Sequence, residues 1–354
     1  MKVTVREVAK AAEVSVGTVS RVLNGDPTVG SDNVDRVTRI ISSLNYHPLR
    51  VRSKPSEDRP LNGKNVALVL LGMDRSLVSL PVVAAAIHGA EAAIAKAGAS
   101  VFLANVPDLD QPSPVLERHR LDGVILKGAL QGNAIGETHN SLLDRLRRLP
   151  SVWILGKPNG CWGDVVSAND MVVGRIAADQ LHQKGHRRFA FINPKSDHVT
   201  FSRRELSFTW RAQELGATVQ RFVGTHPEQW ELPLRPTRDV ASVQELVDAM
   251  LACNPRPTAV FAPGDSIAAL VYRALSARGL RVGRDISVIS CNNERTLNSG
   301  LYPSLATIDT HAEMIGARAV ELLASRLSQS QRGPAVELAI EPEFIAGDSV
   351  HSLN

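Results

Sequence analysis

Cysteine is scarce in this sequence, and long apolar runs are missing. The three cysteines, Cys161, Cys253 and Cys291, are widely spaced and form no Cys-x-x-Cys pair, which argues against a disulfide framework and against a structural zinc site. The longest apolar runs, VALVLLG and LPVVAAAI, are too short to span a bilayer. The N-terminus lacks the apolar core of a secretory signal. These absences predict a cytoplasmic protein with no bound metal and no membrane partner.

Catalytic motifs are missing as well. The chain has no G-x-S-x-G, H-E-x-x-H, G-x-x-x-x-G-K-S/T or G-x-G-x-x-G sequence, so no nucleophile elbow, zinc-binding helix or phosphate-binding loop is indicated. The ten histidines are scattered along the chain. We therefore predict no catalytic residues, no cofactor and no enzymatic activity.

Positive charge is concentrated at the start of the chain. The first 64 residues hold eleven Lys and Arg against seven Asp and Glu, which accounts for the whole net charge of +4. The 354 residues are too many for one compact core and indicate two or three domains. A basic head on a neutral body is typical of a module that binds a polyanion, although an excess of four charges also arises by chance.

The head of the chain has the periodicity of three short helices. Thr4 is an N-cap with Glu7 three positions later, the pattern of a capping box. A second helix starts after Ser15 and ends near Asn24, and a third follows Ser31. Three short helices with a tight turn between the first two match the helix-turn-helix layout of DNA-binding domains. A small bundle with no nucleic-acid role has the same pattern.

The second helix has side chains suited to reading a DNA major groove. Its N-terminal residues are Val16, Gly17, Thr18, Ser20 and Arg21. Arg21 can bond to both acceptors of a guanine, and Val16 can contact a thymine methyl group. Ser15, Thr18 and Asn24 can bind phosphate oxygens, helped by the helix N-terminus. Double-stranded DNA is therefore the predicted partner.

The body of the chain alternates short apolar runs with helical patterns. This alternation predicts parallel sheets with helices on both faces, and its restart near residue 160 indicates two lobes. The predicted fold is an all-α helix-turn-helix head followed by an α/β core of two doubly wound parallel-sheet lobes, with a ligand in the cleft facing the strands' carboxyl ends. The predicted strands are 65–71, 100–104, 123–127, 151–155, 188–193, 218–223, 258–262 and 286–290, and the predicted helices are 80–97, 138–148, 170–184, 203–215, 239–252 and 265–278.

The head closely resembles that of the LacI/GalR family of bacterial transcription regulators. The string VTVREVAKAAEVSVGTVSRVLNG, with NYHP further on, carries the resemblance. It implies that Val16, Gly17 and Arg21 read bases. It also implies contacts to the DNA backbone from Thr4, Ser15, Thr18, Ser20, Asn24 and Tyr46.

The body resembles the same family, whose core is similar to periplasmic sugar-binding proteins. The matching stretches include AADQLHQKGHRRFAFIN, PTAVFAPGDSIAALVYRALSARGLRVGRDISVIS and PSLATIDTHAEMIGARAVELL. The resemblance implies that the chain crosses between the lobes near residues 160, 291 and 323. The predicted domains are a DNA-binding head at 1–48, a hinge at 49–63, a first lobe at 64–160 and 292–322, and a second lobe at 161–291 and 323–354.

The cleft is where the sequence departs from the family pattern. Asn292 stands in place of a carboxylate that often binds sugar hydroxyls, and Gly264 replaces a usual asparagine. The candidate effector-binding residues are Lys127, Trp153, Arg204, Asp265 and Asn292. Retained cations and a lost carboxylate favour an anionic or otherwise unusual effector, or no effector, over a neutral sugar. The alternatives are that Lys127 and Arg204 pair with neighbouring acids and that Trp153 is a core residue.

Residues 82–95, VVAAAIHGAEAAIA, are apolar around most of the helix that they predict. A helix of this kind is covered on both sides, so we predict a homodimer, which the resemblance also implies. The alternative explanation is that alanine is a neutral helix former. A two-fold dimer binds a pseudo-palindromic operator.

The predicted hinge, within NYHPLRVRSKPSEDRP, has Pro55 where the resemblance implies a leucine that wedges into the minor groove. Proline inside a helix costs about 3 kcal/mol, so we predict a shortened or irregular hinge. Arg50 and Arg52 are its predicted DNA contacts, as readers of a narrow minor groove.

These patterns predict a DNA-binding transcriptional repressor that acts as a dimer and responds to a small-molecule effector, sugar or sugar-derived. The alternative function is a soluble small-molecule-binding protein without a DNA role. The basic head and the missing signal sequence argue against that alternative.

Overall fold

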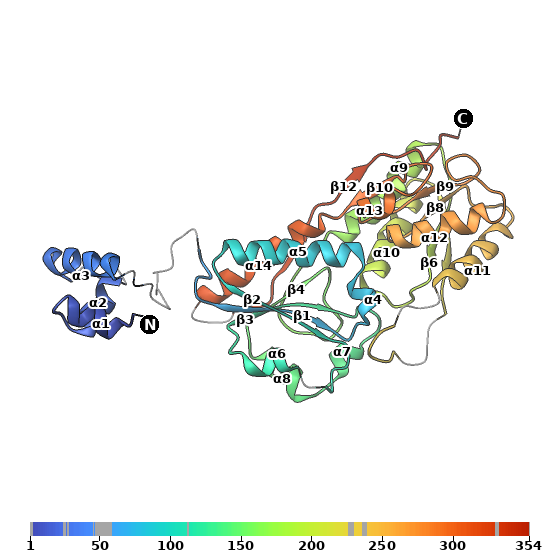
Figure 1. The fold of residues 1–354 in the computed structure, drawn as a ribbon. Helices are drawn as coiled ribbons and strands as arrows, with labels where there is room; N and C mark the ends of the chain where they lie inside the picture. The colour runs from blue at the N-terminus through green and yellow to red at the C-terminus, as the bar shows by residue number, and fades with distance from the viewer. Residues whose placement is uncertain are drawn as a thin grey trace. The chain divides into compact units, whose positions relative to one another are not determined.

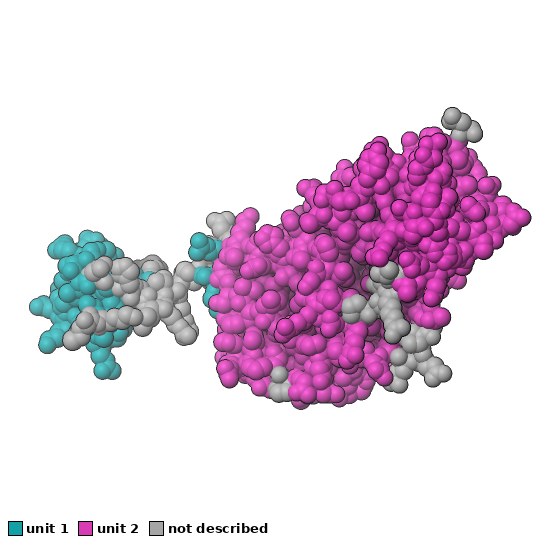
Figure 2. All heavy atoms as spheres, turned by 45° about the vertical axis from the view of Figure 1, so that its right-hand side comes forward, with its two compact units in different colours: residues 1–63 teal, residues 64–354 magenta. Residues whose placement is uncertain are grey.

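The computed structural model describes residues 3–23, 26, 28–44, 46, 59–111, 113–225, 230–235, 239–329 and 333–353. The chain divides into two compact units between Gly63 and Lys64, which Figure 2 shows in different colours. The predicted contacts Asn24, Arg50 and Arg52, together with Pro55, lie outside the described residues.

The first unit holds three short helices, in agreement with the prediction. They are α1 (Val5–Ala11), α2 (Val16–Leu23) and α3 (Ser31–Ser43). The capping box forms: the Thr4 N–H donates to the Glu7 carboxylate at 2.7 Å, and the Glu7 N–H donates to the Thr4 hydroxyl at 3.4 Å. The Ser15 hydroxyl accepts the Thr18 N–H at 3.0 Å and so caps α2. The buried core of this unit consists of Val8, Ala9, Ala12, Val19 and Val37.

The first lobe of the second unit is built on a six-stranded parallel sheet in the order β11-β5-β4-β3-β1-β2. Its strands are β1 (Asn65–Leu71), β2 (Ser100–Val106), β3 (Gly123–Gly128), β4 (Ser151–Ile154), β5 (Asp164–Ala168) and β11 (Glu337–Ile340). β1 and β3 are buried along nearly their whole length, as strands covered on both faces must be. One face is covered by α5 (Pro81–Lys96) and α14 (Ala312–Ser328), and the other by α6 (Pro114–Arg118) and α8 (Ser141–Arg147) (Figure 1).

The second lobe has a four-stranded parallel sheet in the order β7-β6-β8-β9. Its strands are β6 (Arg188–Asn193), β7 (Thr218–Val223), β8 (Ala259–Phe261) and β9 (Ser287–Ile289), and its helices are α9 (Asp170–Gln183), α10 (Val199–Glu214), α11 (Asp239–Leu251) and α12 (Asp265–Ser276). Successive side chains of β6 point into two different hydrophobic cores, one on each face of the sheet. Phe189 and Phe191 pack with α9 and α10, whereas Ala190 and Ile192 pack with α11 and α12.

Shorter elements complete the two lobes. α4 (Arg75–Val78) follows β1, and α7 (Ala134–Glu137) follows β3. In the second lobe, α13 (Arg295–Asn298) follows β9, and β10 (Thr307–Asp309) pairs antiparallel with β12 (Glu343–Ile345).

Strand pairing corrects the predicted lobe boundaries. β5 lies in the first sheet, so the first lobe continues to residue 168 and does not end at 160. β11 pairs with β5, and α14 packs on α5, so 323–340 belongs to the first lobe and not to the second. β10, predicted within the first lobe, packs in the second-lobe core. Hydrophobic periodicity indicates that a strand exists but not which sheet it joins, which is why the crossings were misplaced.

Most predicted elements agree with the structure to within a few residues, with one informative difference at α10. This helix begins at Val199, whereas the predicted start was 203. Its N-cap is His198, whose ring Nδ1 accepts the Phe201 N–H at 3.4 Å. Ser, Thr, Asp and Asn are the usual N-cap residues, so the sequence carried no ordinary start signal at this point.

Two glycines allow α5 and α14 to approach each other closely. A Cβ on Gly89 would lie 2.0 Å from the Glu313 carbonyl oxygen, and a Cβ on Gly316 would lie 2.0 Å from the Ala86 carbonyl oxygen. The two backbones therefore touch where any side chain would separate them. This contact buries Val83, Ala86, Ala90 and Ile94 of α5 and leaves Ala84, Ala92 and Ala95 exposed.

A short segment between β7 and α11, residues 230–235, reaches back to the first lobe, and we call it the strap. The Leu234 N–H donates to the Gly72 carbonyl at 2.8 Å, and the Asp74 N–H donates to the Leu234 carbonyl at 2.9 Å. The Leu234 side chain is buried in the first-lobe core. The strap thus joins the two lobes by backbone hydrogen bonds as well as by apolar packing.

Candidate functional site: a reading helix and a cavity between the lobes

α2 presents most of its predicted DNA-contacting residues to solvent. Ser15, Val16, Gly17, Ser20 and Arg21 are exposed, and Thr18 is half-buried. Val16 is 42% exposed although it is apolar. The Arg21 Nε donates to the Gly17 carbonyl at 3.4 Å. A Cβ at Gly17 would meet only the Ser15 hydroxyl, at 3.6 Å, so nothing within the described chain requires a glycine there.

The other two described residues with predicted DNA contacts already have roles within the head. The Thr4 hydroxyl donates to the Glu7 carboxylate at 3.0 Å as part of the capping box. Tyr46 is half-buried and packs against the core of the head. Contacts from Thr4 and Tyr46 to a DNA backbone stay predictions.

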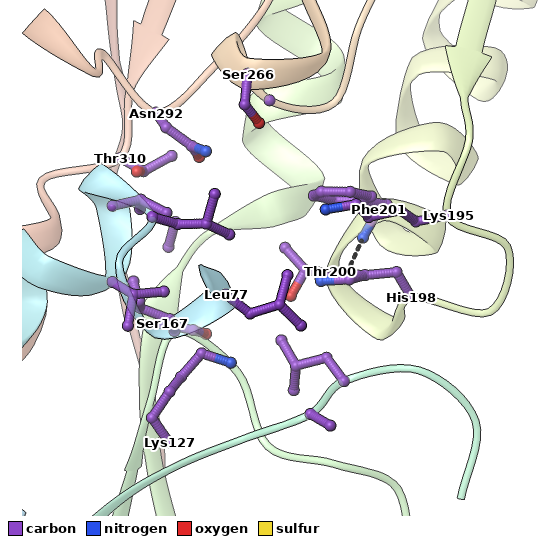
Figure 3. A pocket seen from close by; sticks show the side chains of 18 of the residues that line it. Leu77, Lys127, Ser167, Lys195, His198, Thr200, Phe201, Ser266, Asn292 and Thr310 are labelled. Carbon is purple, nitrogen blue, oxygen red and sulfur yellow. Dashed lines mark hydrogen bonds between the residues drawn. The ribbon is translucent and has the colours of Figure 1, made fainter. Parts of the chain in front are cut away.

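A cavity lies between the two lobes at the carboxyl ends of their parallel strands (Figure 3). Lys127 and Gly128 at the end of β3 line it, as do Ala168 at the end of β5 and Asn292 after β9. Its wall is largely aliphatic, from Met73, Leu77, Leu80, Val82, Val83, Ala129, Leu130, Leu155, Leu234 and Ile315. The topology therefore places the predicted ligand cleft where doubly wound sheets bind ligands.

Lys127 is a buried cation facing this cavity. It is 6% exposed, and its Nζ donates to the Gly128 carbonyl at 2.6 Å. Burial lowers the pKa of Lys127 to about 7, because an ammonium in an apolar surrounding loses its hydration. The structure shows no carboxylate paired with Lys127 among the described residues, which contradicts the alternative that this lysine forms an ion pair with a neighbouring acid.

Arg204 lines the cavity as well, but a carboxylate already neutralises it. The Nε donates to Asp170 at 2.8 Å, and both side chains are at least 95% buried. The Nη1 donates to the Pro263 carbonyl at 2.7 Å and to the Asn292 Oδ1 at 3.2 Å. Burial raises the pKa of Asp170, and the charge of Arg204 opposes that shift. Arg204 therefore joins α9, α10 and the segment after β9, in addition to any ligand contact.

Asn292 and Glu294 form the opposite wall of the cavity. Asn292 adopts a left-handed backbone with φ of 110°, a conformation that non-glycine residues hold only when the surroundings impose it. Burial, followed by the charge of Asp265, raises the pKa of Glu294 to about 7, and hydrogen bonds from the Asn292 side chain and the Val82 N–H oppose this shift.

Two of the predicted effector residues do not reach the cavity. Trp153 is fully buried in the first-lobe core, and its Nε1 donates to the Trp162 carbonyl at 2.6 Å. Asp265 is also fully buried. Its carboxylate accepts hydrogen bonds from the Ser290 and Thr307 hydroxyls, the Glu294 N–H and the Asn298 amide. Trp153 is thus a core residue and Asp265 a structural acceptor, because both side chains point into the protein.

Sequence reasoning missed several cavity residues. They include the aliphatic wall, the Phe201 ring and the polar residues Gln131, Ser167, Lys195, His198, Thr200, Ser266, Glu294 and Thr310. Burial, followed by the charges of Lys127, Lys195 and Arg204, lowers the pKa of His198 well below its usual value, so this ring is neutral. Lys195 and His198 follow β6, whereas Glu294 follows β9 and Thr310 follows β10, and only the position of Lys195, just after the strand at 188–193, carried a signal.

Within the parts of the chain that the structure describes, there is no cluster of His, Cys, Asp and Glu that could hold a metal ion. No described helix is long and apolar enough to cross a membrane.

Known proteins match both parts of the chain. Residues 4–49 match the family described as bacterial regulatory proteins, lacI family, and residues 178–350 match a periplasmic binding protein-like domain. The HTH-type transcriptional repressor PurR of Aliivibrio fischeri (strain ATCC 700601 / ES114) is 30% identical over 353 residues, which cover 98% of each chain. The chain belongs to the LacI family of bacterial regulatory proteins. A PurR repressor of Pasteurella multocida (strain Pm70) is 28% identical over 99% of each chain.

Solved structures agree with this assignment of a LacI-family protein. The lac repressor dimer bound to operator and the anti-inducer ONPF superimposes with a TM-score of 0.70 at 21% identity, over 99% of this chain and 100% of that one, which shows the shared fold. The complex of the transcriptional regulator CelR with cellobiose is 26% identical, with a TM-score of 0.64 over 98% of this chain and 100% of that one. The predicted fold class and the predicted function of a DNA-binding transcriptional regulator are confirmed. The relatives are transcriptional repressors, which agrees with the prediction that the chain is not an enzyme.

Proposed function

We propose that this LacI-family regulator acts in the cytoplasm as a homodimer that binds a pseudo-palindromic operator, with α2 of each protomer in a major groove. The exposed side chains of α2 support the proposal most directly, because Val16 and Arg21 do not pack in the core of the head. Arg21 suits a guanine and Val16 a thymine methyl group. A two-fold dimer presents two such helices, and the same two-fold axis relates the two half-sites of the operator that they bind.

Replacing Arg21 with alanine is expected to weaken operator binding by about 1–3 kcal/mol and to relax specificity at one base pair. An operator selected from random duplexes, followed by anisotropy titrations on its single-base variants, measures this. Arg36→Ala on α3, whose guanidinium bonds to Asn33 at 2.7 Å, is the matched control. An equal loss for Arg21→Ala on every operator variant would make Arg21 a phosphate contact.

The surface of α5 and β2 supports the dimer. β2 is an edge strand of the first sheet, and its Leu103 is 57% exposed. On α5, Ala84, Ala92 and Ala95 are exposed although the opposite face is buried against α14. Apolar residues gathered at a sheet edge and on the neighbouring helix are typical of a subunit interface.

Leu103→Glu is therefore expected to shift the dimer towards monomer and to weaken operator binding, because it places a charge in an apolar interface. Sedimentation velocity over a concentration series, with operator titrations in parallel, measures both effects. Leu206→Glu is the control, since Leu206 on α10 is 64% exposed outside the proposed interface. A Leu103→Glu protein that stays as dimeric as Leu206→Glu would show that β2 is not at the interface.

We propose further that the effector binds in the cavity between the lobes and carries an anionic group, with Lys127, Arg204 and Asn292 among its contacts. Three cations, Lys127, Lys195 and Arg204, act together on the neutral His198 ring. The carboxylate of Asp170 is paired with Arg204. The pairing leaves the buried amine of Lys127 as the group best placed to receive a negative charge.

Anion binding is expected to weaken as the pH rises, because it uses the protonated form of Lys127. With a free-protein pKa of about 7, affinity for a carboxylate should fall by about tenfold between pH 6 and pH 8. Calorimetry with sugar acids, other carboxylates and neutral sugars measures this. Lys127→Met should abolish the pH dependence and Lys184→Met, at an exposed position at the end of α9, should preserve it. Tight, pH-independent binding of a neutral sugar would rule out the anionic effector.

A further inference from the structure

The cavity contains a second set of buried polar atoms that lack partners. Glu294 is 5% exposed and Thr310 is 1% exposed, and both line the cavity. Within the described residues, the Glu294 Oε2 and the Thr310 hydroxyl have no hydrogen-bond partner. Because a buried polar atom without a partner is costly, two of them on residues that line one cavity indicate groups that a ligand satisfies.

These atoms lie on the side of the cavity away from Lys127. Figure 3 shows the Lys127 amine at one side and Asn292 with Thr310 at the other, with the Leu77 side chain between them. Glu294 belongs to the Asn292 side, because it lies two residues further along the same segment and lines the same cavity. A ligand that reaches both polar sets therefore spans the cavity.

The middle of the cavity suits an aliphatic body rather than a sugar ring. Leu77, Leu130, Leu234 and Ile315 line it together with the Phe201 ring (Figure 3), and apolar side chains offer no hydrogen bonds to the ring hydroxyls of a sugar. A polyhydroxylated ligand would leave those hydroxyls unpaired in an apolar surrounding, which is unfavourable.

The Glu294 end favours a cation over a neutral hydroxyl. The charge of Asp265 acts at this end of the cavity: its carboxylate accepts the backbone N–H of Glu294 at 2.7 Å, and its charge helps to raise the pKa of Glu294. An ammonium group would offset both negative charges, whereas a hydroxyl group would supply a hydrogen bond without a charge.

We propose that the effector is a small amino acid with an aliphatic body, whose carboxylate binds at Lys127 and whose ammonium group binds at Glu294 and Thr310. The proposal rests on the anionic effector proposed above for the Lys127 end and adds the opposite end. The Lys127 amine, the Glu294 carboxyl group and the Thr310 hydroxyl then each have a partner of opposite charge or a hydrogen-bond donor.

Matched ligands test the proposal on the full-length protein. Isothermal titration with ω-amino acids from 4-aminobutanoate to 8-aminooctanoate, and with the ω-hydroxy and unsubstituted acids of the same lengths, varies the spacing and the end group separately. The best amino acid is expected to bind at least about tenfold more tightly than its unsubstituted counterpart. The gain in affinity over the unsubstituted acid should be smaller for the hydroxy acid than for the amino acid.

Variants test whether Glu294, Thr310 and Lys127 cause the expected differences in affinity. Glu294→Gln, which keeps the shape of the side chain, should remove most of the preference for the amino acid and leave the affinity for the unsubstituted acid unchanged. Thr310→Val should reduce the same preference in part, and Lys127→Met should weaken binding of all three acids. Glu91→Gln, at an exposed position on α5, is the control and should change neither affinity.

Proton exchange gives an independent readout. A carboxylate at Lys127 draws a proton onto the amine, and an ammonium group at Glu294 expels one from the carboxyl group, so the two effects oppose each other for an amino acid at pH 7. Titrations in two buffers of different ionisation enthalpy should show proton uptake for the unsubstituted acid and close to none for the amino acid.

The two proposals fail differently. If unsubstituted acids bind through Lys127 and no amino acid binds more tightly, the anionic effector stands and the amino-acid effector is wrong. If the hydroxy acid shows the whole gain, a hydroxyl group and not an ammonium group occupies the Glu294 end, which also overturns the proposal. If none of the acids binds, both proposals are wrong.

Discussion

Replacing Arg204 with leucine is expected to lower the free energy of unfolding by about 3–5 kcal/mol. The substitution removes the only cation paired with the buried Asp170 carboxylate in the described structure, and it also leaves the Pro263 carbonyl without the donor at 2.7 Å. A buried carboxylate without a partner is far more costly than the original ion pair. Urea unfolding at pH 7, followed by circular dichroism, measures the loss.

The neighbouring arginine provides the control for this experiment. Arg203 pairs with Glu337 at 3.0 Å, but the two side chains are 48% and 53% exposed. A solvated ion pair contributes about 0–1 kcal/mol, so Arg203→Leu should change stability little. The double variant Arg204→Leu with Asp170→Leu should recover a large part of the loss, because it removes both buried charges. A double variant as unstable as Arg204→Leu would show that packing, and not the unpaired carboxylate, causes the loss.

Asp265→Ala is expected to destabilise the protein by about 3 kcal/mol or more, because four hydrogen-bond donors lose the carboxylate that accepts their bonds. These donors come from the end of β9, from β10 and from the two ends of α13. Asp265→Ala should also weaken effector binding indirectly, since the same segment carries Asn292 and Glu294. Thermal unfolding and effector titration measure the two consequences.

Asp248→Ala provides the comparison, because Asp248 pairs with Arg278 at a solvent-exposed site. It should leave both stability and effector affinity nearly unchanged. If Asp265→Ala weakened effector binding without lowering the unfolding temperature, Asp265 would be a ligand contact, as the sequence predicted, and the buried position seen here would not describe the bound form.

Much of the fold was predictable because buried parallel strands and amphipathic helices have distinct periodicities. β1 and β3 are uninterrupted apolar runs, and the helix boundaries of the head follow from Thr4 and Ser15 as caps. β5 and β11 were not predicted. β5 has only two consecutive large apolar residues, Val165 and Val166, and β11 lies at a sheet edge with three of its four residues exposed, so neither shows a clear apolar run or alternation.

The cavity was predictable in its location but only partly in its residues. The carboxyl ends of the strands pointed to Lys127 and Asn292, which do line it. The same rule selected Trp153 and Asp265, whose side chains point away from it. Glu294 and Thr310 meet there because the segments after β9 and β10 lie side by side, with the Asn292 N–H donating to the Ile308 carbonyl at 2.8 Å, and periodicity carries no information about such pairing.

The strap makes one side chain part of both the cavity wall and the first-lobe core. Leu234 lines the cavity, is buried in the first-lobe core, and hydrogen-bonds through its backbone to Gly72 and Asp74. A smaller side chain at Leu234 is therefore expected to enlarge the cavity and to loosen the first-lobe core together, because the same atoms belong to both.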